Sequence, residues 1–373
     1  MFATPLTPSQ VGDDVDLHAE IRDSVQRVLA SGDWARYRSD VSDALRAEIA
    51  RQLGVGTVRL CSSGSVAMEL ALHGCHLHAA DEVICPALDY PGNVRAVRLL
   101  GATPVIVDSA PGRWTVDADQ VASAGSERTR AVIVSHLYGE IAEVDRLRDL
   151  CDQRGWLLVE DVCQMPGGKI GDRALGSFGH VSAFSFGGSK PLTSGSGGAV
   201  VTNDTRIGQR ISTHADRPSD AYSMSGLQAA VLLPQWQRLD RLVDRQCDAL
   251  DSLLRDCRHQ TPQWSWPSMP DEGFRRSFYK VPIQIAAPLD GSPLPDRMRR
   301  TEQLLSQMEI AAGTPFRTLS KVVSGRGRLV GWENAHRLAT QSFLLNHRDL
   351  VGSSEHRSRL TAKLIAVHDE TAG

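Results

Sequence analysis

The sequence predicts an α/β protein in which helices cover both faces of a mostly parallel central sheet. Short apolar runs rich in Val and Ile alternate along the chain with segments whose apolar residues recur at helical spacing. The runs are continuously apolar, which is typical of parallel strands buried on both faces. Because 373 residues are many for a single core, we expect a large domain over 1–245 and a smaller α+β domain over 246–373.

The two kinds of segment alternate through the predicted large domain. Helices are expected over 41–53, 63–73 and 144–154. Strands are expected over 82–85, 104–108, 131–135, 156–159, 181–186 and 198–202. In a sheet of this kind, ligands bind beyond the carboxyl ends of the strands. His136 and Asp161 lie at strand ends, so both are placed to face a ligand.

The C-terminal third is expected to begin with a long helix over 227–253, kinked at Pro234, that leads to the smaller domain. The stretch 261–295 is rich in Pro and Gly and indicates loops around one strand over 279–285. Two more helices are expected over 299–311 and 355–368.

Composition excludes several classes of function. The chain is 41% hydrophobic and 23% charged, its net charge is −3, and its sequence contains no long run of charges of one sign. Neither a nucleic-acid footprint nor a membrane-surface patch is therefore expected. No apolar run approaches the ~20 residues that span a bilayer, and the polar residues 1–15 are not expected to be a signal peptide.

The cysteines and histidines indicate neither disulfides nor a metal site. Seven cysteines are scattered without any Cys-x-x-Cys pair, which is typical of reduced thiols in a cytoplasmic protein. The run His73-Gly-Cys-His-Leu-His78 lacks the second group of ligands that a zinc site usually needs. We therefore expect no bound metal.

Lys190 carries the strongest local signal for chemistry. It ends the run Phe184-Ser-Phe-Gly-Gly-Ser-Lys190, a Gly/Ser-rich loop that follows a predicted strand. A lysine is reactive only where burial or a neighbouring cation keeps its amine partly neutral. Taken alone, a lysine on such a loop is more often simply solvated.

The context of Lys190 favours a catalytic role. Asp161 supplies the carboxylate that keeps a pyridinium nitrogen protonated, and Gln164 could donate to a ring hydroxyl. Ser185 and the serines at 62–65, which open a helix, offer donors and a positive helix end to a phosphate. Singly, the serines could be an ordinary helix cap and Asp161 a turn cap. Together these residues indicate pyridoxal 5′-phosphate (PLP), bound to Lys190 as a Schiff base.

These residues and their surroundings resemble the DegT/DnrJ/EryC1/StrS family of sugar and aminocyclitol aminotransferases. The likeness extends from about residue 32 to about residue 368. Its matching segments include His136-Leu-Tyr-Gly139 and Glu160-Asp-Val-Cys-Gln164, and the others are 61–72, 81–86, 101–108 and 184–190. The resemblance implies the three-layer fold-type-I architecture of PLP transferases. It also implies a homodimer with the active site between the subunits.

The resemblance assigns roles at matching positions. Lys190 would form the Schiff base and move the proton between substrate and cofactor. Asp161 would pair with the pyridine nitrogen, and Gln164 would contact the ring hydroxyl. His136 and Tyr138 match a motif near the substrate entrance, although both could be structural.

The remaining implied contacts concern the phosphate and the ring face. Ser65, the amide of Val66 and Ser185 would hold the phosphate. Tyr90 occupies the position of an aromatic residue that stacks on the ring, although it could be a half-buried core tyrosine. Arg317 and Arg348 are candidates to bind the carboxylate of an amino donor.

The sequence departs from the family pattern on the side of the site that faces the partner subunit. Ala221, Ser223 and Gly226 replace an asparagine, an arginine and a glutamate. Losing one hydrogen bond to a charged group typically costs ~1.5–3 kcal/mol, so cofactor retention would weaken but binding would persist. Arg217, in a shortened loop nearby, is a candidate to compensate.

We expect an aminotransferase that moves nitrogen from L-glutamate or L-glutamine to a ketone. The segments 134–145 and 343–352 resemble the aminocyclitol and 3-amino-5-hydroxybenzoate branch, which implies a keto-cyclitol or keto-sugar acceptor in antibiotic-type biosynthesis. Two alternatives stay open. One is a PLP enzyme that performs elimination, decarboxylation or other carbanion chemistry; the other is a non-catalytic regulatory homologue.

Overall fold

A computed structural model describes residues 15–216, 220, 222–268, 272–286, 293–321 and 327–372. The predicted polar N-terminal stretch therefore lies almost wholly outside the described residues. None of the helices within these ranges is both long and apolar enough to cross a membrane.

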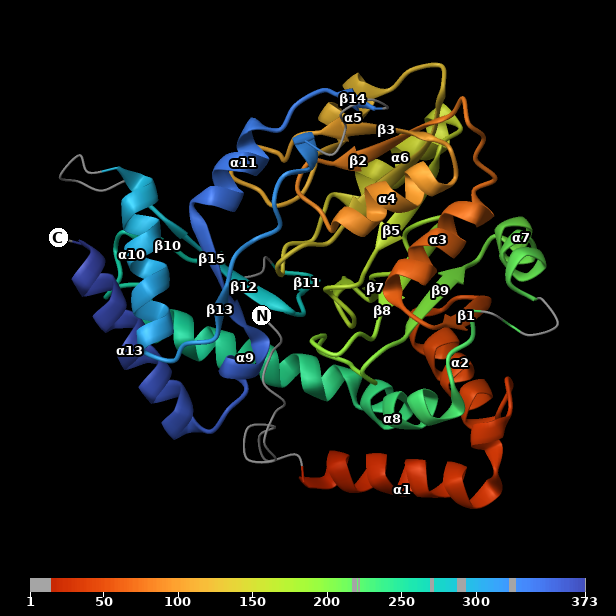
Figure 1. Cartoon of the computed structure of the whole chain (residues 1–373), viewed down its shortest axis with the longest axis horizontal. Coiled ribbons are helices and arrows are strands. Elements are labelled where there is room, and N and C mark those ends of the chain that lie inside the picture. The colour runs from red at the N-terminus through yellow and green to blue at the C-terminus, as the bar shows by residue number, and fades with distance from the viewer. Residues whose placement is uncertain are drawn as a thin grey trace.

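An eight-stranded sheet forms the centre of the larger part of the molecule (Figure 1). Its strands, in spatial order, are β1 (Thr57–Cys61), β9 (Gly198–Thr202), β8 (Val181–Ser185), β5 (Leu157–Asp161), β4 (Thr129–Ser135), β2 (Glu82–Pro86), β3 (Thr103–Val107) and β14 (Arg328–Leu329). Only β9 runs against the others, because it pairs antiparallel with both β1 and β8. The prediction of a mostly parallel sheet is thus confirmed.

Helices cover both faces of this sheet and give the three predicted layers. One face packs against α2 (Asp40–Leu53), α5 (Ala118–Ala124), α6 (Val144–Arg154) and α8 (Gly226–Gln237). The other packs against α3 (Gly64–Gly74), α4 (Pro91–Leu99) and α7 (Thr205–Ala215). Successive strand residues serve opposite cores, as Val132 and Ile133 do, because side chains alternate along a strand. This double burial explains the continuous apolar runs.

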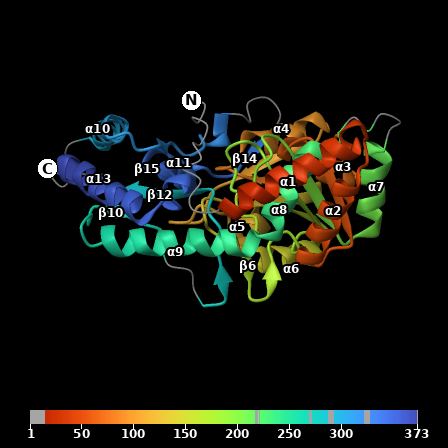
Figure 2. The same ribbon diagram turned by 90° about the horizontal axis from the view of Figure 1, so that it is seen from below.

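A second, four-stranded antiparallel sheet has its own core. It consists of β10 (Trp264–Ser265), β12 (Lys280–Ile285), β15 (Ser342–Asn346) and β13 (Ala312–Gly313). Its core takes residues from α9 (Leu239–Cys257), α10 (Leu294–Gln307) and α13 (Ser354–Ala372). Figure 2 shows α9 running from the larger part into this smaller one. Leu239 and Val243 belong to the large core and Leu250 to the small one, which supports the predicted boundary at 245; that boundary stays a prediction.

The predicted long helix over 227–253 is in fact two helices. The break lies at Arg238, where the backbone leaves the helical region, and not at Pro234, which sits inside α8. The reason is packing: α8 lies along the large sheet, whereas α9 leaves it for the small core. Helix α1 (Val15–Ser31), which packs along α8 (Figure 1), and helices α4, α5 and α7 were not predicted.

Two elements connect segments that are far apart in the sequence. β14 adds to the edge of the large sheet beside β3, with Arg328 opposite Val105. A small sheet joins β6 (Lys169–Ile170) and β7 (Arg173–Ala174) to β11 (Phe274–Arg275). Helices α11 (Glu333–Thr340) and α12 (His347–Leu350) complete the C-terminal part.

Candidate active site

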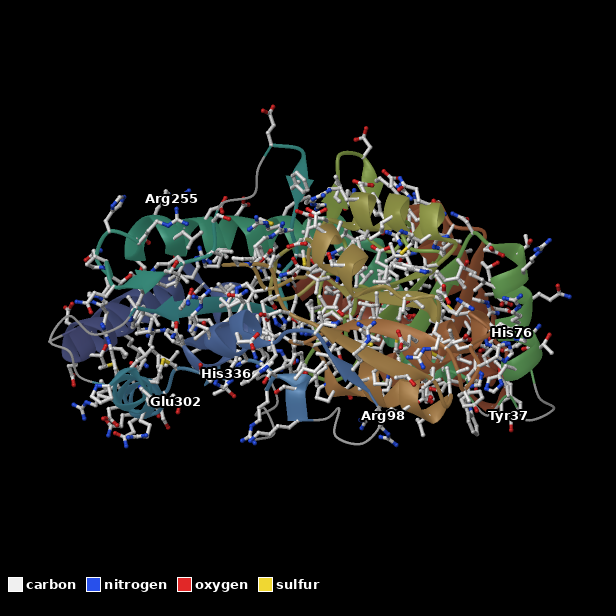
Figure 3. The ribbon with its side chains drawn as sticks, turned by 90° about the horizontal axis from the view of Figure 1, so that it is seen from above. Tyr37, His76, Arg98, Arg255, Glu302 and His336 are labelled. Carbon is white, nitrogen blue, oxygen red and sulfur yellow. The ribbon has the colours of Figure 1, made fainter. Side chains whose placement is uncertain are left out.

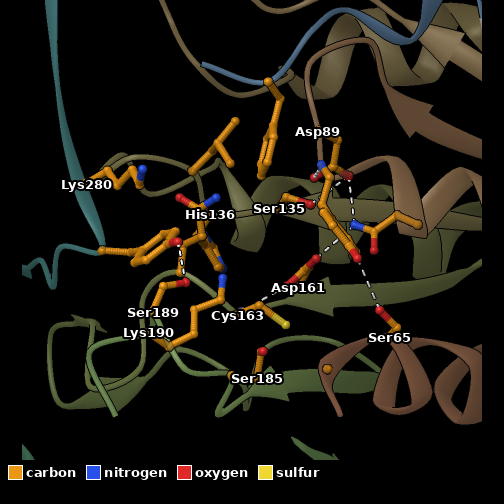
Figure 4. Close-up of a pocket in the computed structure, with 18 of the residues that line it drawn as sticks. Ser65, Asp89, Ser135, His136, Asp161, Cys163, Ser185, Ser189, Lys190 and Lys280 are labelled. Atoms are coloured by element: carbon orange, nitrogen blue, oxygen red, sulfur yellow. Dashed lines mark hydrogen bonds between the residues drawn. The ribbon is translucent and has the colours of Figure 1, made fainter. Parts of the chain in front are cut away.

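A pocket of about 330 Å³ opens at the carboxyl ends of the parallel strands. Loops after β1, β2, β4, β5 and β8 line it, and residues of β12 and β15 close it from the small sheet. Eight residues singled out from the sequence line this one pocket: Ser65, Tyr90, His136, Tyr138, Asp161, Gln164, Ser185 and Lys190. Figure 4 shows Lys190, Asp161 and Ser185 around the same space.

Val66 does not line the pocket. Its backbone N–H donates to Ser63 Oγ at 3.2 Å, so in this structure the amide is used to cap α3. The role predicted for this amide in phosphate binding stays a prediction.

Asp161 ends β5 and is held rigidly in the floor of the pocket. Its carboxylate accepts from the backbone N–H of Cys163 at 2.9 Å and from Asn93 Nδ2 at 2.8 Å. The side chain is buried. Among the residues that the structure describes, no cation bonds to this carboxylate, and a buried carboxylate of this kind is suited to a positively charged ring nitrogen.

Gln164 is oriented by the backbone of a neighbouring turn. Its Oε1 accepts from the N–H of Tyr138 at 3.2 Å, which leaves the Nε2 donor for a ligand. Tyr138 has a left-handed backbone with φ of 55° and is followed by Gly139 with φ of 82°. Its hydroxyl accepts from the N–H of Phe316 at 2.9 Å. The turn therefore holds both the amide of Gln164 and a loop from the C-terminal part.

Lys190 is half-buried at the end of a turn after β8. Its backbone N–H donates to the carbonyl of Gly187 at 3.0 Å, and its Nζ lies 4.3 Å from the ring centroid of Tyr279. Within the described parts of the chain, no carboxylate forms an ion pair with this Nζ. An amine without an ion-pair partner is available for covalent chemistry.

The loop that carries Lys190 is anchored from several elements. Ser189 Oγ bonds to the hydroxyl of Tyr279 at 2.8 Å, just before β12. Arg348, on α12, donates to the carbonyl of Gly188 at 2.8 Å. Further along, Gln235 on α8 accepts from the N–H of Thr193 at 3.0 Å and donates to its carbonyl at 2.9 Å.

The start of α3 and Ser185 form a tight cradle. Ser63 caps the helix, and the next residue, Gly64, packs directly against Ser185. A Cβ at position 64 would lie 2.5 Å from Ser185 Cβ and 2.7 Å from its hydroxyl, so only glycine fits. Beyond it, Ser65 Oγ lies 3.3 Å from the hydroxyl of Tyr90. Serine hydroxyls and a positive helix end are the donor set that a phosphate requires.

His136 is held by the protein on both sides of its ring. Nε2 bonds to Glu160 at 3.1 Å, and Nδ1 accepts from the N–H of Ala142 at 3.2 Å. Burial alone would raise the pKa of Glu160, but His136 and the backbone N–H groups of Gly176 and Gly179 outweigh it and lower that pKa. These contacts favour the structural alternative for His136.

Among the pocket residues that were not singled out in the sequence are Asp89, Asn93, Tyr279, Lys280 and Phe316. Asp89 and Asn93 follow β2 at helical spacing, a strand-end signal like the one that identified Asp161. The other three come from the C-terminal part, where no motif marks them.

The departures from the family pattern lie partly outside the described residues, namely Ala221 and Arg217. Ser223 lines a different surface pocket. Gly226 begins α8, and a Cβ there would lie 3.0 Å from Ser39 Oγ, so a larger residue would disturb the cap of α2. Neither Arg317 nor Arg348 lines the active-site pocket.

Known proteins with similar sequences and folds identify the class of this protein. The model of the DegT/DnrJ/EryC1/StrS aminotransferase family matches residues 15–298. An L-glutamine:2-deoxy-scyllo-inosose aminotransferase from Streptomyces kanamyceticus is 32% identical over 80% of this chain and 75% of its own length. A GDP-perosamine synthase from Escherichia coli O157:H7 is 30% identical over 65% of this chain and 68% of its own.

Solved structures have the same fold. The crystal structure of 3-amino-5-hydroxybenzoic acid synthase superimposes with a TM-score of 0.85, at 22% identity, over 99% of this chain and 98% of the other. The chain belongs to the DegT/DnrJ/EryC1/StrS aminotransferase family. It is a PLP-dependent aminotransferase with the fold-type-I architecture.

The residues of the pocket fit this cofactor. A buried carboxylate, a lysine without an ion-pair partner and a glycine-lined cradle with two hydroxyls lie around one cavity. Each corresponds in chemistry to one part of PLP: the ring nitrogen, the aldehyde and the phosphate.

Proposed function

We propose that this aminotransferase moves the amino group of L-glutamine or L-glutamate to the ketone of a cyclic polyol, with a keto-sugar as the alternative acceptor. The observation that carries the proposal is the meeting of Lys190, Asp161 and the Ser185 cradle in one pocket. The similarity to an L-glutamine:2-deoxy-scyllo-inosose aminotransferase supports the donor and the cyclitol acceptor. Such a reaction belongs to secondary-metabolite biosynthesis.

The proposed roles of the binding residues follow from their geometry. Asp161 holds the ring nitrogen, Gln164 Nε2 donates to the ring hydroxyl, and Tyr90 stacks on the ring. Ser65 and Ser185 donate to the phosphate, and we keep the amide of Val66 as a further donor. When bound, PLP supplies an electron sink that accepts the bonding pair of the substrate Cα–H bond.

Lys190 is the proposed general acid and base. With PLP bound, its Nζ would hold the cofactor covalently, and as a free amine it would take the proton from the substrate α-carbon and pass it to the cofactor. In the opposite half-reaction the same Nζ returns a proton to the former ketone carbon. The ring of Tyr279, whose centroid lies 4.3 Å from Nζ, covers one side of the amine.

Lys280 is the proposed anchor for the carboxylate of the amino donor. It is half-buried on β12, lines the pocket, and forms no ion pair among the described residues. Its Nζ lies 5.5 Å from the ring centroid of Tyr279, on the side of the pocket where Figure 4 shows Lys190. Arg317 and Arg348, the candidates from the sequence, do not line the pocket, so we favour Lys280.

We also propose a cytoplasmic homodimer. Tyr90 is 44% exposed although its hydroxyl contacts Ser65, so a second subunit could cover it. Trp34 and Tyr37 are likewise exposed at the surface, where Figure 3 shows Tyr37 at the edge of the molecule. Seven free cysteines suit a reducing compartment. Light scattering of the purified protein tests the dimer.

An absorption spectrum before and after L-glutamine is added tests the function. A visible imine band that L-glutamine bleaches, and that Lys190→Ala lacks, is expected. A band that neither L-glutamine nor L-glutamate bleaches would favour elimination or decarboxylation. No band after incubation with PLP would contradict the proposal and favour the regulatory homologue.

A further inference from the structure

A second buried carboxyl lies next to Asp161. Asp89 follows β2, and Asn93 Nδ2 donates to both acids, at 2.9 Å to Asp89 Oδ2 and 2.8 Å to Asp161 Oδ2. Ser135 Oγ donates to the same oxygen of Asp89 at 2.9 Å, and the N–H of Tyr90 donates to Oδ1 at 2.7 Å. Figure 4 shows Asp89 and Asp161 near each other in this part of the pocket. We call Asp89 and Asp161 the carboxyl pair.

Among the residues that the structure describes, no cation bonds directly to Asp89. Its three hydrogen-bond donors are neutral, and its exposed fraction is 1%. The titratable groups that face it are Asp161 on β5, Cys85 on β2, and Cys163 and Tyr138 on the loops beyond β5 and β4. None of these is a cation.

The protonation of each neighbour follows from burial. Burial raises the pKa values of the Cys85 and Cys163 thiols well above their usual range and raises the pKa of the Tyr138 hydroxyl too, so all three are neutral near pH 7. Burial, and then the charge of Asp161, raise the pKa of Asp89 to about 7. Near neutral pH Asp89 is therefore only partly ionised, so the carboxyl pair carries less than two full negative charges.

We propose that Asp89 is a positioning residue of the cofactor site: through Asn93 it orients Asp161, and its own ionisation sets the negative charge that the site presents to the cofactor ring. This inference rests on the proposed role of Asp161. A cationic ring nitrogen beside the carboxyl pair favours the ionised form of Asp89. Cofactor binding near pH 7 should therefore release a proton from Asp89, and the affinity for PLP should rise as the pH increases through 7.

The experiment measures the dissociation constant of PLP from the apoprotein between pH 5.5 and 9, for wild type and Asp89→Asn. If binding lowers the pKa of Asp89 by one unit, wild type gains about tenfold in affinity across pH 7 relative to the variant. The ratio of the two constants removes the titration of PLP itself, which both proteins share. Asp108→Asn, a buried strand-end carboxyl outside the pocket, is the matched control and should follow wild type.

Parallel pH curves for wild type and Asp89→Asn would overturn the inference. If Asp89→Asn does not fold, Ser135→Ala replaces it. This variant loses a donor to the ionised form of Asp89, so the rise in PLP affinity should occur at a higher pH than in wild type. A rise at the wild-type pH would contradict the inference. The imine band in the same samples distinguishes a failure of the proposed function from a failure of the role of Asp89. Its absence from wild type refutes the proposed function, whereas a band with parallel pH curves refutes only the role of Asp89.

Discussion

Replacing Gly64 by alanine should push the start of α3 away from Ser185 and so open the phosphate cradle. The added Cβ would lie 2.5 Å from Ser185 Cβ and 3.2 Å from its Cα, whereas ordinary contacts begin at 3.4 Å. The start of α3 and the end of β8 must therefore separate by roughly 1 Å, since backbone as well as side chain is in the way. Both proposed phosphate donors, Ser65 and Ser185, lie on the two elements that separate.

The expected loss can be worked out from the bonds concerned. A hydrogen bond to a charged group contributes about 1.5–3 kcal/mol, so losing one raises the dissociation constant of PLP about 10- to 100-fold. Overpacking also costs about 1–3 kcal/mol of folding stability. Titration of apoprotein with PLP, followed by fluorescence or absorbance, gives the first value, and urea unfolding gives the second.

Two variants show whether the cause is the cradle. Ser185→Ala removes the hydroxyl without overlap and should weaken PLP binding to a similar degree. Gly56→Ala is the matched control, because its Cβ would meet only Asn203 Oδ1 at 3.6 Å, and it should bind like wild type. A dissociation constant for Gly64→Ala within about twofold of wild type would refute the reasoning.

Two further predictions concern charge. Lys280→Met should raise the KM for L-glutamine about 10- to 100-fold and leave the imine band unchanged. The control Lys363→Met, on α13, should leave the KM unchanged. Equal KM values for the two variants would contradict the role of Lys280 as the anchor of the donor carboxylate. For Asp89, the folded pKa of about 7 exceeds the ordinary 3.8, so folded apoprotein keeps a proton that the unfolded chain releases above pH 4. The unfolding free energy of wild type should fall by up to roughly 4 kcal/mol from pH 4 to 7 relative to Asp89→Asn. Denaturant titrations that give the same pH dependence for both proteins would contradict this prediction.

The sequence predicted six of the eight strands of the large sheet, because these six are short, mostly apolar and mostly buried. It missed β1, whose first three residues are only half-buried, and β14. The residues at the strand ends, Asp161 and Lys190, could be found for the same reason, since the topology alone sends strand ends to one edge. Asp89 and Asn93 carried the same signal after β2. They were missed because no chemistry was assigned to them.

The rest depends on contacts between distant segments. Lys280 and Phe316 reach the pocket only because the small sheet packs beside it. No local sequence pattern predicts that packing. The two-residue strand β14 is too short for any periodicity, and its pairing with β3 spans more than 200 residues of chain. The helix break at Arg238 follows from two separate cores and not from the proline nearby.

The anchoring of the Lys190 loop limits how this enzyme could be redesigned. Ser189 and Gly188 are held by Tyr279 and Arg348 from the C-terminal part, whereas Thr193 is held by Gln235 on α8. An exchange of the C-terminal part for that of a relative, made to obtain a new acceptor, would replace two of the three supports of the lysine as well. Selectivity and reactivity are thus inherited together in this chain, and chimaeras should keep the Tyr279 and Arg348 contacts if they are to remain active.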